Sequence, residues 1–235
     1  MRLYAIGDLH MSGGDNKPMD VFGPQWDRHF FHIQENWKKA VREEDVVLVP
    51  GDISWAMQLK DAEADLKEIG LLPGRKIICK GNHDYWWNSI SRVRSILPPS
   101  VSAVQHSAVA LEDCVVCGTR GWIMPTEEQP LGAQDMKIYL REAERLRLAL
   151  GEAARIADGK PVVAMVHYPP LLAGEKDTLF TGIMEEYRVH TVVYGHLHGQ
   201  GVQSGYTGEH RGVRYHLVSC DSIGFSPKEI PLDEK

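Results

Sequence analysis

The 235-residue sequence lacks any apolar run near the ~18 residues that would span a membrane. It also lacks the pattern of a signal peptide, because the short apolar run after Met1 leads directly into the charged residue Asp8. From these two absences we expect a protein of the cytoplasm with no membrane partner.

The sequence has no excess of positive charge. Its 26 Lys and Arg residues stand against 32 Asp and Glu residues, which gives a net charge of -6. A protein that binds nucleic acid through a broad basic face needs the opposite balance. The composition therefore argues against such a face and leaves only a local basic groove open.

Cysteine is scarce, with Cys79, Cys114, Cys117 and Cys220 as the four examples. Cys114 and Cys117 form a Cys-x-x-Cys pattern, which is found in redox and zinc sites. Here the segment is strand-like, so the two side chains would point to opposite faces, and no second pair lies at zinc-finger spacing. We interpret all four as small buried apolar side chains.

Long linkers, internal repeats and low-complexity segments are also missing, which predicts a single domain over residues 1–235. Solid apolar runs alternate with segments of helical periodicity, as expected for strands buried on both faces. The pattern predicts strands at 3–6, 46–49, 76–79, 162–166 and 191–194, and helices at 26–43, 57–72, 87–97, 134–157 and 178–187. Residues 101–118 read as an antiparallel meander, and 202–206 with 213–219 as a closing antiparallel pair.

Five apolar runs end in residues that bind metals or transfer protons. These clusters are Asp8-Leu9-His10, Gly51-Asp52, Gly81-Asn82-His83-Asp84, His167 and Gly195-His196-Leu197-His198. Loops at the carboxyl ends of strands meet at one edge of an open α/β sheet, so we expect the clusters to converge. The glycines before Asp52, Asn82 and His196 would allow the backbone to turn tightly.

The order of these clusters resembles the calcineurin-like metallophosphoesterase superfamily, including bacterial predicted phosphohydrolases without an assigned substrate. The matching patterns are Asp-x-His, Gly-Asp, Gly-Asn-His-Asp, a lone His after a strand, and Gly-His-x-His, and they span positions 8 to 198. The resemblance implies an α/β fold: a four-layer α/β/β/α sandwich of two mixed sheets. It also implies a dinuclear metal site at the carboxyl ends of the strands.

The same resemblance implies a role for each residue. Asp8, His10, Asp52 and His198 would hold one metal ion, and Asp52, Asn82, His167 and His196 the other. Nitrogen and oxygen ligands without thiolate favour manganese, iron or zinc over calcium. A hydroxide activated by the metals would attack the phosphorus atom.

His83 is not a metal ligand in this scheme. It would act as a general acid or stabilise charge in the transition state. Asp84 would orient the His83 imidazole, with capping of the next helix as the alternative.

Two further residues are candidates for substrate binding. Arg120 follows a predicted strand and could clamp a phosphate bidentately, although we favour the alternative of a surface or fold-bridging arginine. Trp86 belongs to a set of aromatic residues near the motifs that could form a wall for the substrate or pack the loops. The other members are Trp55, Tyr85, Trp87 and Trp122.

The implied function is a metal-dependent phosphoesterase that hydrolyses a phosphate mono- or diester. We expect a small phosphoester as substrate, with nucleic acid less favoured because the chain is acidic. The alternatives are a non-catalytic metal-binding interaction scaffold on the same fold, or a nuclease.

Overall fold

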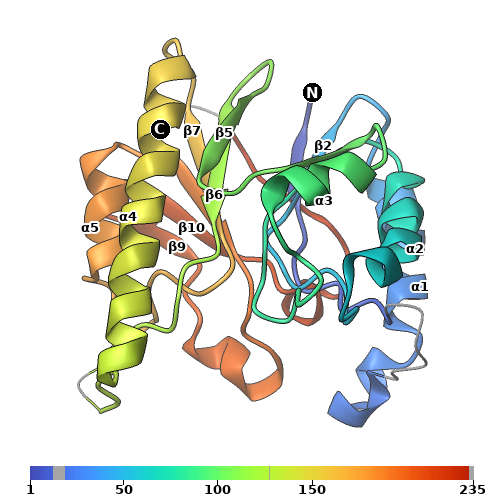
Figure 1. The fold of residues 1–235 in the computed structure, drawn as a ribbon, viewed down its shortest axis with the longest axis horizontal. Coiled ribbons are helices and arrows are strands. Elements are labelled where there is room, and N and C mark those ends of the chain that lie inside the picture. Colours follow the sequence, from blue (N-terminus) through green and yellow to red (C-terminus); the bar gives the residue numbers. More distant parts are fainter. Residues whose placement is uncertain (13–18, 127, 233–235) are drawn as a thin grey trace.

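Two β-sheets lie face to face at the centre of the molecule, and helices cover the outer face of each (Figure 1). The structure, a computed structural model, describes residues 1–12, 19–126 and 128–232. The resulting four layers confirm the α/β/β/α sandwich expected from the sequence.

The first sheet has the strand order β11-β1-β2-β3-β4. Strands β1 to β4 run parallel, and β11 joins β1 antiparallel, so the sheet is mixed. The strands are β1 (Leu3–Ala5), β2 (Val46–Val49), β3 (Arg75–Ile78), β4 (Val101–Ala103) and β11 (Lys228–Glu229).

The second sheet has the order β5-β6-β7-β8-β10-β9. Its central strands are parallel and both edge strands are antiparallel, which makes this sheet mixed as well. The strands are β5 (Ser107–Ala110), β6 (Val115–Thr119), β7 (Val162–Val166), β8 (Thr191–Tyr194), β9 (Gly208–His210) and β10 (Val213–Leu217).

Helices α1, α2 and α3 pack on the first sheet, and α4 and α5 on the second. Their bounds are α1 (His29–Ala40), α2 (Leu59–Gly70), α3 (Ile90–Ile96), α4 (Ala133–Ile156) and α5 (Leu179–Glu186). Helix α4 buries a stripe of residues three and four positions apart, as an amphipathic helix does. One member of this stripe is the charged residue Glu142.

The strands bury both faces because side chains alternate along them. In β2, Val47 and Val49 pack toward the helices, whereas Val46 and Leu48 pack between the sheets. Unbroken apolar runs in the sequence therefore contribute side chains to two hydrophobic cores at once. All four cysteines are free and buried, as predicted.

Two sequence expectations about strand pairing are wrong. Residues 101–103 do not join an antiparallel meander but form β4, parallel to β3 in the first sheet, while β5 and β6 pair in the second. Residues 199–204 form a short 3-10 helix, and the partner of β10 is β9 at 208–210. Short strands of similar composition carry no periodic signal that specifies their partner.

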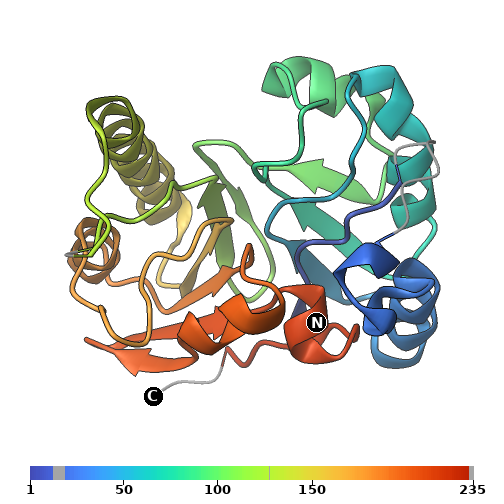
Figure 2. The same ribbon diagram turned by 90° about the horizontal axis from the view of Figure 1, so that it is seen from below.

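The carboxyl ends of β1, β2, β3, β7 and β8 open on one face of the molecule, seen from below in Figure 2. Among the described residues, no helix is both long enough and apolar enough to cross a membrane.

Candidate metal centre

The loops after five parallel strands bring all seven predicted metal ligands together. Asp8 and His10 follow β1, Asp52 follows β2 and Asn82 follows β3 in the first sheet. His167 follows β7, while His196 and His198 follow β8 in the second sheet. The centre thus lies at the junction of the two sheets, with ligands from both.

One group of ligand atoms surrounds the side chain of Asp8. His198 Nε2 lies 3.3 Å from Asp8 Oδ1 and 3.4 Å from His10 Nε2. His10 Nε2 lies 3.8 Å from Asp52 Oδ2. The ligand atoms of Asp8, His10 and His198 are close enough to one another to hold one metal ion.

A second group surrounds the amide oxygen of Asn82. His167 Nε2 lies 2.6 Å from Asn82 Oδ1, and His196 Nδ1 lies 2.8 Å from the same atom. His167 Nε2 is also 3.4 Å from Asp52 Oδ2. Asp52 Oδ2 therefore faces both groups, as a bridging carboxylate would.

The backbone is in the left-handed region at four of the seven ligands. The φ angles are +60° at Asp8, +44° at His10, +51° at Asp52 and +74° at His196. A non-glycine residue rarely adopts this conformation, and such residues gather at functional sites where the surrounding structure holds them in place.

Glycines in the motifs allow the loops to approach the carboxylates closely. A Cβ atom on Gly81 would lie 2.1 Å from Asp52 Oδ1, and one on Gly195 would lie 2.2 Å from Asp8 Oδ2. Neither glycine has a positive φ. The reason for glycine at these two positions is thus close packing and not the tight turn that the sequence suggested.

The centre concentrates buried negative charge. Burial alone would raise the pKa of Asp8, but the hydrogen bond from His198 and the charges of nearby histidines hold it well below its usual value. Burial, together with the charges of Asp84 and Asp8, raises the pKa of Asp52 well above its usual value. Cations between these carboxylates would relieve their repulsion, so the donor set fits metal ions.

Three of the histidines have lone pairs ready for a metal. Burial lowers the pKa of His10 and of His196 to about 3, and it also lowers the pKa of His167. These imidazoles are neutral at pH 7, which is the form that binds metals. The His167 ring is oriented by its Nδ1 atom, 3.0 Å from the carbonyl oxygen of Pro50.

His198 differs because a carboxylate that the sequence did not reveal contacts it. Asp221 Oδ1 lies 2.8 Å from His198 Nδ1, and Asp221 Oδ2 accepts a hydrogen bond from Gly199 N–H at 2.9 Å. Burial would lower the pKa of His198, but the hydrogen bonds to Asp221 and Asp8 raise it to about 10. A carboxylate behind a metal-binding histidine fixes the ring and makes it a stronger ligand.

Asp84 has a different role from the predicted one. Its fully buried carboxylate accepts hydrogen bonds from the backbone N–H groups of Asp52, Ile53, Ser54 and Gly81 and from the indole of Trp86. These bonds fix the β2 and β3 loops to each other. Asp84 therefore positions the backbone of Asp52, a contact that neither sequence interpretation of Asp84, orientation of the His83 ring or capping of the next helix, included.

His83 lies at the edge of the centre. Its backbone N–H donates to Asp52 Oδ1 at 2.8 Å, while its half-buried ring packs on Trp55 at 4.4 Å between centroids. Tyr85 Oη lies 3.5 Å from His83 Nδ1. The ring also lies 5.8 Å from the His10 ring, between centroids, and lines a neighbouring cavity.

That cavity, the aromatic pocket, has a volume of about 210 Å³. Its lining includes the imidazoles of His10, His83 and His198 and the indoles of Trp26 and Trp55. The Trp55 ring stacks on the His10 ring at 4.9 Å. Of the predicted aromatic wall only Trp55 lines this pocket, and Trp26 was not foreseen because it precedes α1, far from any motif.

Trp86 and Arg120, the two candidates for substrate binding, have protein partners in the structure. Trp86 is fully buried, packs against Trp87 and donates its indole N–H to Asp84. The Arg120 guanidinium stacks over Trp122 at 4.5 Å and lies 3.7 Å from Glu142. Only the backbone carbonyl of Arg120 reaches the centre, where it accepts from His167 N–H at 3.1 Å.

Comparisons with known proteins agree with this geometry. A model of the family described as calcineurin-like phosphoesterase matches residues 1–200. The Gene 66 protein of Mycobacterium phage D29 is 36% identical over 86 residues, which cover 35% of this chain and 40% of the phage protein. The match therefore spans less than half of that relative.

Two solved structures are similar over almost their whole length. Phosphopantetheinyl hydrolase from Mycobacterium tuberculosis aligns with a TM-score of 0.61 at 15% identity, covering 99% of this chain and 96% of the other. A protein of unknown function from Aquifex aeolicus aligns with a TM-score of 0.54 at 15% identity, covering 97% and 95%. At this identity the likeness concerns the fold alone.

Proposed function

We propose that this chain, which belongs to the calcineurin-like phosphoesterase family, is a metal-binding hydrolase that cleaves a small phosphate mono- or diester at a centre of two metal ions. The observation that carries the proposal is the position of Asp52. Its Oδ2 atom lies within 4 Å of one nitrogen in each ligand group.

Each ligand group would hold one ion. Asp8, His10, Asp52 and His198 would bind the first, and Asp52, Asn82, His167 and His196 the second. When bound, two ions supply a hydroxide nucleophile at neutral pH and stabilise charge on the phosphate. The absence of thiolate ligands favours manganese, iron or zinc.

The neutral oxygen of Asn82 limits the negative charge of the centre. Two divalent ions carry four positive charges, and Asp8 and Asp52 supply two negative ones. A remaining positive balance favours binding of a phosphate ester, whereas a further carboxylate in place of Asn82 would repel it.

His83 would act on the phosphate or on the leaving group. Burial lowers the pKa of His83. The neutral ring predominates at pH 7, so we assign it hydrogen-bond donation to the transferred phosphate in preference to full proton transfer.

The aromatic pocket would hold the leaving group, because His83 lines it together with two of the proposed ligands, His10 and His198. Indole walls favour a flat or apolar group over a strongly hydrated one. The proposed substrate is therefore a phosphoester whose leaving group is aromatic or apolar.

Hydrolysis of aryl phosphate mono- and diesters with added Mn²⁺ tests this proposal. We expect turnover of at least one of the two, and their ratio identifies the preferred ester. Mn²⁺ binding without hydrolysis of either ester would contradict the proposal.

A further inference from the structure

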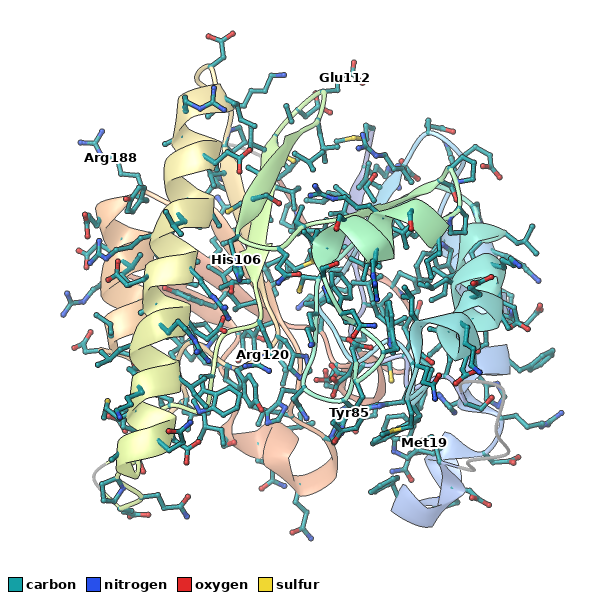
Figure 3. The ribbon with its side chains drawn as sticks, in the orientation of Figure 1. Met19, Tyr85, His106, Glu112, Arg120 and Arg188 are labelled. Atoms are coloured by element: carbon teal, nitrogen blue, oxygen red, sulfur yellow. The ribbon has the colours of Figure 1, made fainter. Side chains whose placement is uncertain are left out.

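A second buried polar cluster lies beside the metal centre. It surrounds a cavity of about 190 Å³ whose charged lining is Lys80, Arg120, Glu142 and Arg145, together with His106. We call it the cationic pocket. Figure 3 shows His106 and Arg120 one above the other beside α4.

The pocket is built from both sheets and one helix. Lys80 follows β3, His106 precedes β5, Arg120 follows β6, and Glu142 and Arg145 lie on α4. Tertiary structure therefore gathers these charges from three separate parts of the chain: the loop after β3, the two ends of the β5–β6 hairpin, and α4.

Glu142 is the one carboxylate that lines the pocket. Its side chain is 1% exposed, and Oε1 accepts from Arg145 Nη1 at 2.5 Å. Arg120 Nη2 lies 3.7 Å from the same oxygen, and Oε2 accepts from Thr119 Oγ1 at 2.8 Å. Glu142 thus fixes two arginine side chains in place.

The positive charges outnumber this carboxylate. Lys80 Nζ donates to a neutral partner, the carbonyl of Trp87, at 2.9 Å. Three cations around one carboxylate leave two positive charges in a chain whose net charge is -6. An ion pair that served only to join α4 to the sheet would need one cation for one carboxylate.

One donor in the pocket lacks a partner. Arg120 Nε is buried and has no hydrogen-bond partner among the described residues. Buried polar atoms of native proteins are almost always satisfied, and a bound ion or water is the usual explanation when protein offers none.

We propose that the cationic pocket binds a doubly charged tetrahedral oxyanion, such as phosphate or sulfate. Such an anion would balance the two surplus charges and accept hydrogen bonds from the planar guanidinium groups, which match phosphate geometry. The inference stands on this pocket alone and goes beyond the proposed reaction.

The anion would lie next to the metal-binding loops. Lys80 is two residues before Asn82, and the carbonyl of Arg120 accepts hydrogen bonds from the N–H groups of His167 and Tyr168 at 3.1 and 3.0 Å. Two sources have the required chemistry: a second phosphate group of the substrate, or free inorganic phosphate.

Sulfate binding to the metal-loaded full-length protein tests the proposal. Calorimetric titration at constant ionic strength should give roughly ten- to a hundredfold weaker binding to the pocket in Arg145→Gln, because the variant loses a charge-assisted hydrogen bond to the anion. Arg141→Gln is the matched control, because Arg141 is an exposed arginine on the same helix. Tungstate soaked into crystals should show anomalous density in the pocket of the wild type and of Arg141→Gln, and none in Arg145→Gln.

Kinetics separate the two sources. If the substrate supplies the anion, Arg145→Gln raises KM for a substrate with two phosphate groups and leaves KM for an aryl phosphate unchanged. If free phosphate is the source, KM is unchanged for both, while the rise in Tm with added phosphate is smaller in Arg145→Gln.

Equal sulfate affinity in the wild type and in a folded Arg145→Gln, with no tungstate in the wild-type pocket, would overturn the proposal. Because neither measurement depends on turnover, an inactive enzyme would contradict the proposed function and leave this inference standing.

Discussion

The metal centre and the cationic pocket are neighbouring polar clusters with opposite charge balance. The centre packs the carboxylates of Asp8, Asp52 and Asp84 among largely neutral histidines. The pocket packs three cations around Glu142. Each cluster holds charge that its protein partners leave uncompensated, so each is suited to an ion of the opposite sign.

The two clusters also differ in how they are held. In the centre, strained backbone and buried hydrogen bonds fix the loops, with four ligands at positive φ. In the pocket, long side chains from α4 and two loops converge on one carboxylate. We expect substitutions at the centre to affect activity most and those in the pocket to affect stability and anion binding.

The largest effect should follow from removing the shared negative charge of the centre. Asp52→Asn should lower kcat/KM by about a thousandfold or more, because bound ions supply several kcal/mol of transition-state stabilisation. Elemental analysis of the purified variant should show fewer than two ions per chain. Full metal content with unchanged kcat/KM would contradict the bridging role.

A smaller effect is expected from substituting His83, which is not one of the proposed metal ligands. His83→Ala should lower kcat by about 10²–10⁴-fold, the usual contribution of a proton-transferring or hydrogen-bonding group, with metal content unchanged. His83→Gln keeps a hydrogen-bond donor and should recover part of this loss. If both variants have the same low kcat, and the pH profile of kcat loses one of its limbs, His83 transfers a proton.

Asp221 should affect metal affinity more than chemistry. Asp221→Asn weakens the orientation of His198, and loss of such a carboxylate typically costs about 10–100-fold in metal affinity. Activity measured against Mn²⁺ concentration should shift to higher concentrations and recover at saturation. Unchanged Mn²⁺ dependence would mean that Asp221 only holds the loop at Gly199.

The smallest effect is expected from neutralising the pocket's carboxylate. Glu142→Gln should lower the free energy of unfolding by about 1–3 kcal/mol. The cost stays in this range because Arg120 and Arg145, which lose a charged partner, are partly exposed and can bond to water. That corresponds to a fall in Tm of roughly 2–4 °C per kcal/mol for a chain of this size. If the variant lost bound metal out of proportion to its loss of stability, the two clusters would not be independent.

The sequence predicted the centre better than its surroundings. Asp8, Asp52 and Asn82 could be placed because each follows a solid apolar run, and parallel strands bring their carboxyl ends to one edge. Asp221 could not, since its contact with His198 depends on β10 lying beside β8 in the sheet. No local pattern carries that neighbour relation.

The same limit explains why the sequence predicted neither the burial of Trp86 nor the cationic pocket. Residues next to a motif are exposed to the site only on average. Trp86 is instead buried, with its indole N–H bonded to Asp84. Glu142 lies in an amphipathic helix, where a single buried carboxylate resembles an ordinary surface residue. The role of Glu142 in the cationic pocket depends on Arg120 and Lys80, which lie outside α4.

The pairing of Asp8 with the β8 loop has a consequence for biosynthesis. Its carboxylate accepts hydrogen bonds from the N–H of His196, 188 positions further along the chain. During translation, the partners of this early segment emerge from the ribosome only after most of the later sequence has been synthesised. Nascent chains that stop before residue 196 lack the full ligand set, so metal retention would distinguish completed chains from arrested ones.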